Sequence, residues 1–308
     1  MNATPTWSAQ DIPEQNGRVV LVTGSNSGTG FEAAKALARR GARVILACRQ
    51  ETRAMAAEHH IRAECPGAAL ERIQLDLGDL ASIRDAAREI RTRHPRLDLL
   101  INNAGVMVPP FGRTCDGFEL QFGTNHLGHF ALTGLLLPLL LATPGSRVVT
   151  MSSAAHKMGR IRFEDLQSER GYRAWAAYGQ SKLANLLFTF ELQRRLQRAG
   201  SATLALAAHP GWARTELQRH IPGHPLMRMF MAATSPFMSQ EAAQGALPLL
   251  RAAVDPAAVG SDYFGPSGCG EWKGAPVRVQ SNRRSRSEAD QHRLWECSQQ
   301  LTGIVFTI

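Results

Sequence analysis

The stretch RVVLVTGSNSGTGFEAAKALARRGA, residues 18–42, joins an apolar, β-branched run to an alanine-rich segment with helical spacing. Between the two, residues 23–30 read TGSNSGTG and hold three glycines in eight residues. So many glycines are unfavourable inside a strand or a helix, because glycine loses the most conformational freedom on folding. The stretch therefore predicts a strand, a loop and a helix, and the loop is either a phosphate cradle or a tight turn.

A short apolar run followed by a longer helical segment recurs along the chain. Further strand-like runs are ARVILAC, ALERIQLDL, LDLLINNAG, SRVVTMSS and ATLALAAHPG, at residues 42–48, 69–77, 97–105, 146–153 and 202–211. Alternating strands and helices, with nearly continuous apolar strands, are typical of a parallel sheet covered on both faces. The sequence thus predicts an α/β fold with one doubly wound, Rossmann-type parallel sheet of about seven strands.

The regions outside this alternation predict how the rest of the chain is organised. Residues 1–17 are interpreted as an arm over the surface, ahead of a single domain over 18–308. From about 212 to 240, prolines interrupt apolar helical material, which predicts a cap over a ligand cleft. Residues of about 285–304 have amphipathic spacing and predict a helix that packs back on the domain.

Composition narrows the class of protein. The 308 residues are 44% hydrophobic and 20% charged, as expected for a folded protein with a core. No apolar run reaches the roughly 18 residues of a membrane-spanning helix, and the N-terminus lacks the basic start and apolar centre of a secretory signal. The five cysteines are scattered and form no CxxC pair, which argues against disulfides or a zinc site and favours a cytoplasmic protein.

The formal net charge of +9 could serve nucleic acid, anionic lipid or a phosphorylated ligand. However, the arginines are spread along the chain, the one dense run is RRSRS at 283–287, and basic residues do not alternate with aromatic ones. Single-stranded nucleic acid is commonly bound by stacking its bases on such aromatic residues. A solvated basic surface is therefore favoured, and we expect no nucleic-acid partner.

The glycine loop lies where an open α/β sheet binds phosphate. Gly24 would permit the tight turn, Gly28 the approach of the backbone to a ligand, and Gly30 close packing of the helix. The helix N-terminus beyond offers free N–H groups and a partial positive charge. Taken alone, the spacing TGxxxGxG favours a dinucleotide site only slightly over a plain turn.

The end of the second strand indicates which dinucleotide would bind. NAD sites carry an acidic residue there, which contacts the ribose 2′-hydroxyl. Here Cys48 is followed by Arg49, with Arg53 one turn later. A guanidinium can bind a 2′-phosphate with two hydrogen bonds. We therefore favour NADP(H) over NAD(H); the alternative is an arginine that only solubilises a loop.

Polar residues also end the third and fourth strands, in LDLGD and INNAGVM. Asp76 would lie near an adenine, or would cap the helix that follows. Asn102 and Asn103 would contact the cofactor or hold the strand ends together.

Tyr178 and Lys182 stand four residues apart in AWAAYGQSKLANLLFTFELQRRL, a strongly helical segment. Residues at this spacing share a helix face, so the phenol and the ammonium can point into one cleft. Hydride transfer to a carbonyl requires a proton donor, and the reverse reaction requires a base. Because tyrosine ionises near pKa 10, we expect the ammonium to lower the pKa of Tyr178. A chance pair on an exposed helix is the alternative.

Two further groups of polar residues are candidates. Ser152 and Ser153 end a strand in TMSSAAH, where they could hydrogen-bond a substrate carbonyl or form an ordinary turn. Asn125, in TNHLGHF, lies in an otherwise apolar helical stretch, where a buried amide must find a partner.

Together these motifs resemble the short-chain dehydrogenase/reductase family over residues of about 17–304. TGSNSGTG, ILACR, LDL, INNAGVM, NHLGHF, SS and YGQSK occur in the order found in that family. ACR, GFELQFGTNHLGHF, DLQSERGY, SKLANLLF, HPG and LWECSQQLTGI are most similar to the retinol dehydrogenase and WW-domain oxidoreductase branch. Thr29 departs from the pattern, since the family more often has an apolar residue there, and a polar one could loosen the loop.

The resemblance implies a role for each matching residue. Tyr178 would donate or accept the proton, Lys182 would hold the nicotinamide ribose and lower the pKa of Tyr178, and Ser153 would orient the substrate. Asn125 would hold a proton-relay water, and Thr215 would contact the nicotinamide carboxamide. The implied cofactor-binding residues are Thr23, Gly24, Ser27, Gly28, Thr29, Gly30, Arg49, Asp76, Leu77, Asn103, Ala104, Gly105, Tyr178, Lys182, Pro210, Gly211 and Thr215.

These residues predict an NADP(H)-dependent oxidoreductase that interconverts an alcohol and an aldehyde or ketone. The apolar stretch of about 226–237 suggests an apolar small-molecule substrate. No membrane anchor like that of the membrane-bound retinol dehydrogenases is expected, which weakens the inference of a retinoid substrate. A homo-oligomer is possible. The alternative is a sensor or interaction protein that binds NADPH without turnover, since fold does not fix function.

Overall fold

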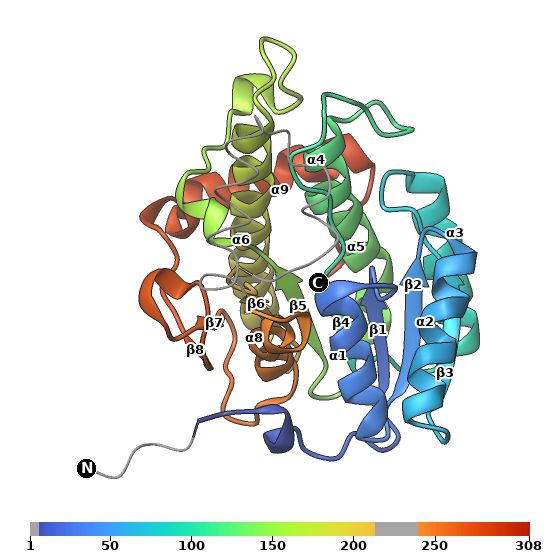
Figure 1. The fold of residues 1–308 in the computed structure, drawn as a ribbon. Helices are drawn as coiled ribbons and strands as arrows, with labels where there is room; N and C mark the ends of the chain where they lie inside the picture. The colour runs from blue at the N-terminus through green and yellow to red at the C-terminus, as the bar shows by residue number, and fades with distance from the viewer. Residues whose placement is uncertain (1–5, 213–239) are drawn as a thin grey trace.

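The computed structural model describes residues 6–212 and 240–308. Its strands form one sheet in the order β3-β2-β1-β4-β5-β6-β7-β8 (Figure 1). The strands are β1 (Val19–Thr23), β2 (Arg43–Cys48), β3 (Leu70–Gln74), β4 (Leu99–Asn102), β5 (Arg147–Met151), β6 (Leu204–Ala208), β7 (Tyr263–Pro266) and β8 (Pro276–Arg278). The strand order reverses between β1 and β4, which is where doubly wound sheets bind ligands.

The predicted Rossmann-type α/β fold is confirmed, with one difference in the sheet. The strands from β3 across to β7 are parallel, as expected, whereas β8 is an eighth strand and pairs antiparallel with β7. The sequence predicted about seven strands because β8 has only three residues, Pro276–Arg278, and no apolar pattern of its own. A proline in it is tolerated because β8 lies at the edge of the sheet.

Helices cover both faces of the sheet. The α-helices are α1 (Gly28–Arg39), α2 (Glu51–Glu64), α3 (Leu80–Arg93), α4 (Leu120–Phe122), α5 (Gly128–Leu141), α6 (Ala174–Arg198), α8 (Ala242–Val254) and α9 (Glu288–Thr302). Shorter turns are η1 (Ala9–Asp11), the π-helical η2 (Gly123–Leu127), η3 (Ala154–Lys157), η4 (Phe163–Asp165), η6 (Cys269–Glu271) and η7 (Arg283–Arg286). No helix among the described residues is both long and apolar enough to cross a membrane.

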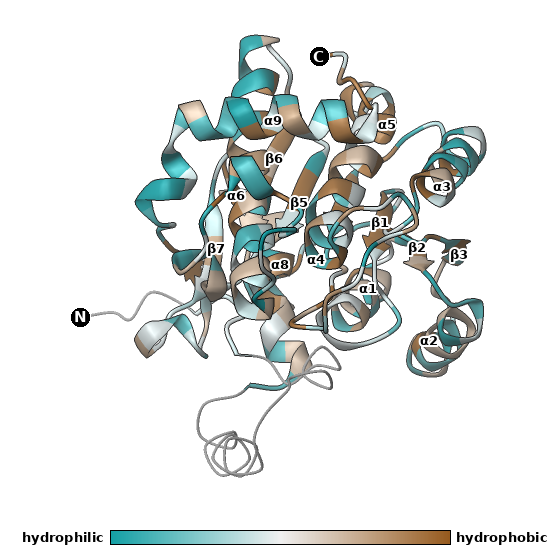
Figure 2. Cartoon of the chain, turned by 90° about the horizontal axis from the view of Figure 1, so that it is seen from above, coloured by the Kyte–Doolittle hydropathy of each residue, from teal (hydrophilic) through white to brown (hydrophobic). Residues whose placement is uncertain are grey.

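Alternation along the strands divides the core into two layers. Val20 and Val22 of β1 pack in a cluster with residues of α1 and α8, while Val19 and Leu21 pack in a second cluster with residues of α3 and α5. Successive side chains of a strand point to opposite faces, so both faces of these strands must be apolar. Figure 2 shows the complementary pattern, with hydrophilic residues concentrated on outer helices such as α3 and α9.

The two ends of the chain pack against this framework. In the N-terminal segment, expected as an arm, Ile12 is 2% exposed and the backbone N–H of Gln15 donates to the carbonyl of Arg40 at the end of α1. The C-terminal segment expected as a helix contains η7 and α9, and α9 runs across α6 (Figure 1). There Trp295 stacks on Phe188 with the ring centroids 5.9 Å apart. Most of the cap expected over 212–240 lies outside the described residues.

Three of the buried histidines, His126, His129 and His156, are held as neutral rings. Burial lowers the pKa of His126 to about 3 and the pKa of His129 and His156 to about 4. An unfolded histidine takes up its proton near pKa 6.5. Between pH 6.5 and about 4 the unfolded chain therefore binds more protons than the folded one, so stability falls as the pH falls.

We predict that the free energy of unfolding, measured by urea titration, decreases between pH 7 and pH 5. Each buried histidine accounts for about 2 kcal/mol of this loss, because one pKa unit corresponds to about 1.4 kcal/mol. His126→Gln should make the free energy of unfolding depend less steeply on pH, whereas the same substitution at the exposed His60 should leave that dependence unchanged. A free energy that is the same at both pH values would contradict the burial of neutral rings.

Candidate active site

The carboxyl ends of the central parallel strands border a cleft of about 1150 Å³. Gly30 and Asn125 lie behind its lining, and Thr215 lies outside the described residues. All the other predicted site residues line the cleft: Thr23, Gly24, Ser27, Gly28, Thr29, Arg49, Asp76, Leu77, Asn103, Ala104, Gly105, Ser153, Tyr178, Lys182, Pro210 and Gly211. The fold therefore brings residues from six strand ends and α6 into one site.

The glycine loop has the geometry of a phosphate cradle. Gly24 and Gly28 adopt positive φ angles of 66° and 58°, which favour glycine. A Cβ at Gly30 would lie 2.4 Å from the side-chain nitrogen of Asn103 and 2.5 Å from the carbonyl oxygen of Gly24. The hydroxyl of Ser27, the N-cap of α1, makes no capping hydrogen bond. The loop thus presents the N-terminus of α1 to the cleft, as an anionic phosphate requires.

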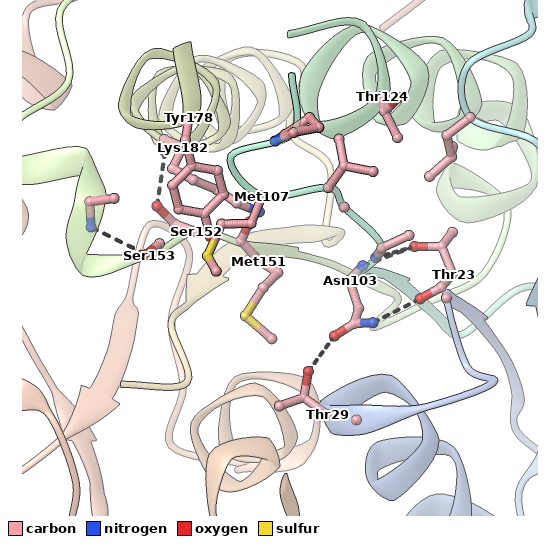
Figure 3. A pocket seen from close by; sticks show the side chains of 18 of the residues that line it. Thr23, Thr29, Asn103, Met107, Thr124, Met151, Ser152, Ser153, Tyr178 and Lys182 are labelled. Atoms are coloured by element: carbon pink, nitrogen blue, oxygen red, sulfur yellow. Dashed lines mark hydrogen bonds between the residues drawn. The ribbon is translucent and has the colours of Figure 1, made fainter. Parts of the chain in front are cut away.

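Thr23, at the end of β1, joins the glycine loop to the loop after β4 (Figure 3). Its hydroxyl accepts hydrogen bonds from the backbone N–H groups of Asn103 (2.9 Å) and Ala104 (3.0 Å). The side-chain amide of Asn103 donates to the Thr23 carbonyl at 2.9 Å. The hydroxyl of Thr29 donates to the amide oxygen of Asn103, also at 2.9 Å. The polar Thr29 therefore holds the glycine loop against Asn103, contrary to the expectation that a polar residue here could loosen the loop.

The far end of the cleft carries two positive charges and one carboxylate. Arg49 follows β2, Arg53 lies in the first turn of α2, and both line the cleft. The carboxylate of Asp76 accepts a hydrogen bond from the backbone of Gly78 at 2.8 Å. The capping role weighed for Asp76 belongs instead to Asp79, which accepts from the first turn of α3. These residues can hold an adenosine whose ribose carries a phosphate.

Asn125 shapes the site from behind. It is fully buried in the π-helical turn η2. Its side-chain oxygen accepts from the backbone N–H of Val106 at 2.7 Å, and its nitrogen donates to the Val106 carbonyl and the Ser181 hydroxyl, each at 2.9 Å. Asn125 is thus the buried amide with partners that the sequence required, and it fixes the loop after β4 to α6. The relay water implied by the resemblance remains a prediction.

Ser153, Tyr178 and Lys182 meet on the opposite wall of the cleft (Figure 3). Ser153 is the N-cap of η3, where its hydroxyl accepts from the backbone N–H of Ala155 at 3.2 Å. Burial raises the pKa of Tyr178, and the nearby Ser153 side chain acts against that rise. Ser152 also borders the cleft, but its hydroxyl is engaged in a hydrogen bond, which it donates to the carbonyl of Lys182 at 2.9 Å. Ser153 is therefore the serine placed to contact a substrate beside the phenol.

Burial changes the ionisation of both α6 residues. It raises the pKa of Tyr178 to about 12 and lowers the pKa of Lys182 to about 8. The predicted lowering of the Tyr178 pKa by Lys182 is therefore not observed. The Lys182 Nζ lies 5.8 Å from the centre of the tyrosine ring and donates to the Met151 carbonyl at 3.2 Å, so desolvation outweighs its influence. A phenol that stays protonated at neutral pH can donate a proton to an oxygen bound beside Ser153.

The part of the lining that the sequence did not identify is largely apolar. It includes Met107, Pro109, Met158, Trp175 and Trp272. Trp272 belongs to a glycine-rich loop that folds against the end of β6, where its carbonyl accepts from Trp212 at 2.8 Å. VMVPP, directly after INNAG, could have indicated this wall, whereas Trp272 reaches the cleft only through tertiary contacts.

Comparisons with known proteins agree with this geometry. Residues 18–224 match the model of the short chain dehydrogenase family. Retinol dehydrogenase 12 of Mus musculus is 43% identical over 290 residues, which cover 94% of this chain and 87% of the relative.

Solved structures give the same result. An uncharacterized protein from Mycobacterium paratuberculosis is 43% identical, with a TM-score of 0.81 over 99% of this chain and 100% of that one. A short chain dehydrogenase from Shigella flexneri, complexed with NADP, is 27% identical, with a TM-score of 0.63 over 82% of this chain and 97% of that one. The glycine loop, the Ser153–Tyr178–Lys182 wall and these similarities lead to one conclusion: the chain belongs to the short-chain dehydrogenase family.

Proposed function

We propose that this protein is an NADP(H)-dependent oxidoreductase that interconverts an alcohol and an aldehyde or ketone with apolar substituents. The observation that carries the proposal is that Ser153, Tyr178 and Lys182 line the same cleft as the glycine loop. The bound nicotinamide would supply or accept a hydride. The chain itself would position the carbonyl and move the proton.

The residues of the cleft fit such a cofactor. Gly24 and Gly28 bring backbone to the cleft in conformations that favour glycine, and the N-terminus of α1 suits a pyrophosphate. Arg49 and Arg53 at the end of β2 suit a ribose phosphate. Structures related to this chain include one complexed with NADP.

In carbonyl reduction, the Ser153 hydroxyl would hold the carbonyl oxygen and Tyr178 would donate its proton to that oxygen. Both side chains line the cleft, and Ser153 lies close enough to Tyr178 to influence the pKa of the phenol, so the two hydroxyls can reach one substrate oxygen. Lys182 would orient the nicotinamide ribose from its place in α6. Burial raises the pKa of Tyr178 to about 12, so the phenol is protonated at neutral pH, which is the form that carbonyl reduction requires of its proton donor.

An apolar substrate is supported by the wall beyond Tyr178. Met107, Met158 and Trp175 line it, and exposed fractions of 61% for Met158 and 39% for Trp175 leave apolar surface near the mouth of the cleft. Two relatives that are 43% identical to this chain are named retinol dehydrogenase 12. An aldehyde or ketone with a long chain or a ring would cover this surface and remove it from water.

We predict that Tyr178→Phe lowers kcat for NADPH-dependent carbonyl reduction by about 10²- to 10⁴-fold, because the proton donor is lost. NADPH affinity, measured by fluorescence titration, should change little. The matched control is Tyr172→Phe, which removes a phenol that donates to the Pro109 carbonyl outside the reacting centre. Tight NADPH binding with no turnover in either the wild type or the variant would support the sensor alternative instead.

We also predict that Arg49→Ala raises the KM for NADPH about 10- to 100-fold, the range expected when a hydrogen bond to a charged group is lost. The KM for NADH should stay nearly constant, because NADH lacks the 2′-phosphate. Arg43→Ala is the control, since Arg43 pairs with Glu71 at the opposite end of β2. An equal rise in the KM for NADPH and in the KM for NADH would contradict the assignment of Arg49 to the 2′-phosphate.

A further inference from the structure

A fully buried histidine, His156, lies directly behind the turn that carries Ser153. It belongs to η3, whose N-cap is Ser153. Ser153, Ala154 and Ala155 line the cleft, whereas His156 does not. The ring therefore touches no substrate, and its hydrogen bonds are directed into the protein.

The partners of the His156 ring define its protonation. Its Nδ1 lies 2.6 Å from the carbonyl oxygen of Ser153. Because a carbonyl can only accept, Nδ1 must carry the hydrogen. Its Nε2 lies 3.3 Å from the backbone nitrogen of Asn282, which can only donate, so Nε2 must be the acceptor. The ring is thus neutral and held as the Nδ1–H tautomer between two backbone groups.

The second partner comes from a distant part of the chain. Asn282 precedes η7, and its side-chain nitrogen donates to the His156 carbonyl at 2.8 Å. Two residues later, the Arg284 guanidinium donates to the carbonyl of Gly159 at 3.2 Å. The Asn282 side-chain oxygen caps η7 by accepting from Ser285 at 3.0 Å. The segment before α9 therefore holds the turn after β5 at several points.

The remaining side of the His156 ring is closed by β7. The ring of Tyr263 packs edge-to-face on it, with centroids 5.6 Å apart and planes at 83°. Tyr263 is 3% exposed, and its phenol lies 3.5 Å from His156 Nδ1. With β7 on one side and Asn282 on the other, the imidazole has little freedom to rotate.

We propose that His156 is a positioning residue for Ser153. Its Nδ1–H fixes the Ser153 carbonyl, and Asn282 fixes the ring, so that the Ser153 hydroxyl is held beside the phenol of Tyr178. The inference rests on the proposed function in one respect, which is that Ser153 orients the substrate carbonyl. It adds that the segment around Asn282, far from the cofactor loop in sequence, completes the substrate-orienting turn.

The tautomer is tested without any turnover. Nitrogen-15 NMR of the histidine side chains at pH 7 should show the His156 ring with a proton on Nδ1, protected from solvent exchange. The buried His129, whose Nδ1 lies 3.0 Å from the Asn125 carbonyl, should give a second signal of this kind, and His156→Asn should remove only the signal of His156. An Nε2–H or doubly protonated ring at this position would overturn the proposal. This result stands even if no carbonyl substrate is reduced, in which case the proposed function fails separately.

The effect on Ser153 is tested by a double-mutant cycle. His156→Phe fills the space without either hydrogen bond and should lower kcat for carbonyl reduction about 10- to 100-fold, as expected when a reacting group is misplaced. The Kd for NADPH should stay within about two-fold. In a Ser153→Ala background the same change should have little further effect, because residues that act as a unit are not additive.

Two further variants separate positioning from folding. His156→Asn keeps an N–H near the position of Nδ1 and should recover most of kcat, which also provides a folded variant if His156→Phe is unstable. His94→Asn changes another buried histidine, one that pairs with Glu71 away from the cleft, and should leave kcat unchanged. A kcat within about two-fold of wild type in His156→Phe, or an equal loss with and without the Ser153 hydroxyl, would overturn the proposal.

Discussion

The hydroxyl of Thr23 is the contact on which the site depends, because it fixes the ends of β1 and β4 to each other. It accepts from the backbone of Asn103 and Ala104, and the Asn103 side chain returns a hydrogen bond to the Thr23 carbonyl. Parallel strands end at one edge of a sheet, but a cleft forms there only if the loops beyond diverge in fixed directions. Thr29 and Asn125 extend the same arrangement into α1 and α6.

Burial determines the chemistry available on the wall of the cleft that Ser153, Tyr178 and Lys182 form. Tyr178 and Lys182 are 7% and 4% exposed, and desolvation moves both toward their neutral forms. A neutral phenol next to a serine hydroxyl is a proton donor of fixed direction, which is what an alkoxide formed on a carbonyl requires. The Met151 carbonyl accepts from both Lys182 and Asn185 and so anchors α6 to β5. The strand that leads to Ser153 and the helix that carries Tyr178 are therefore held in fixed relative positions.

Much of this arrangement could be predicted from the sequence, and the exceptions have physical reasons. TGSNSGTG and the YGQSK helix identify their own local structure, because glycine conformation and helical spacing are local properties. The partners of Asn125 and the wall formed by Trp272 depend on contacts between distant segments. The cap that Asp79 provides for α3 is local, but LDLGD offers two acidic residues and the spacing alone did not decide between them. The pKa of Tyr178 was predicted with the wrong sign because spacing shows that Lys182 is near but not how deeply the phenol is buried.

The most direct test of the account is whether hydride leaves NADPH for a carbonyl on this protein. Purified enzyme would be given NADPH deuterated at the nicotinamide C4, in each of its two stereochemical forms, with a panel of medium-chain aldehydes and ring ketones. The account predicts that one of the two forms delivers deuterium to the carbinol carbon of an alcohol product, detected by mass spectrometry. Stoichiometric binding of NADPH with no label in any alcohol would contradict it.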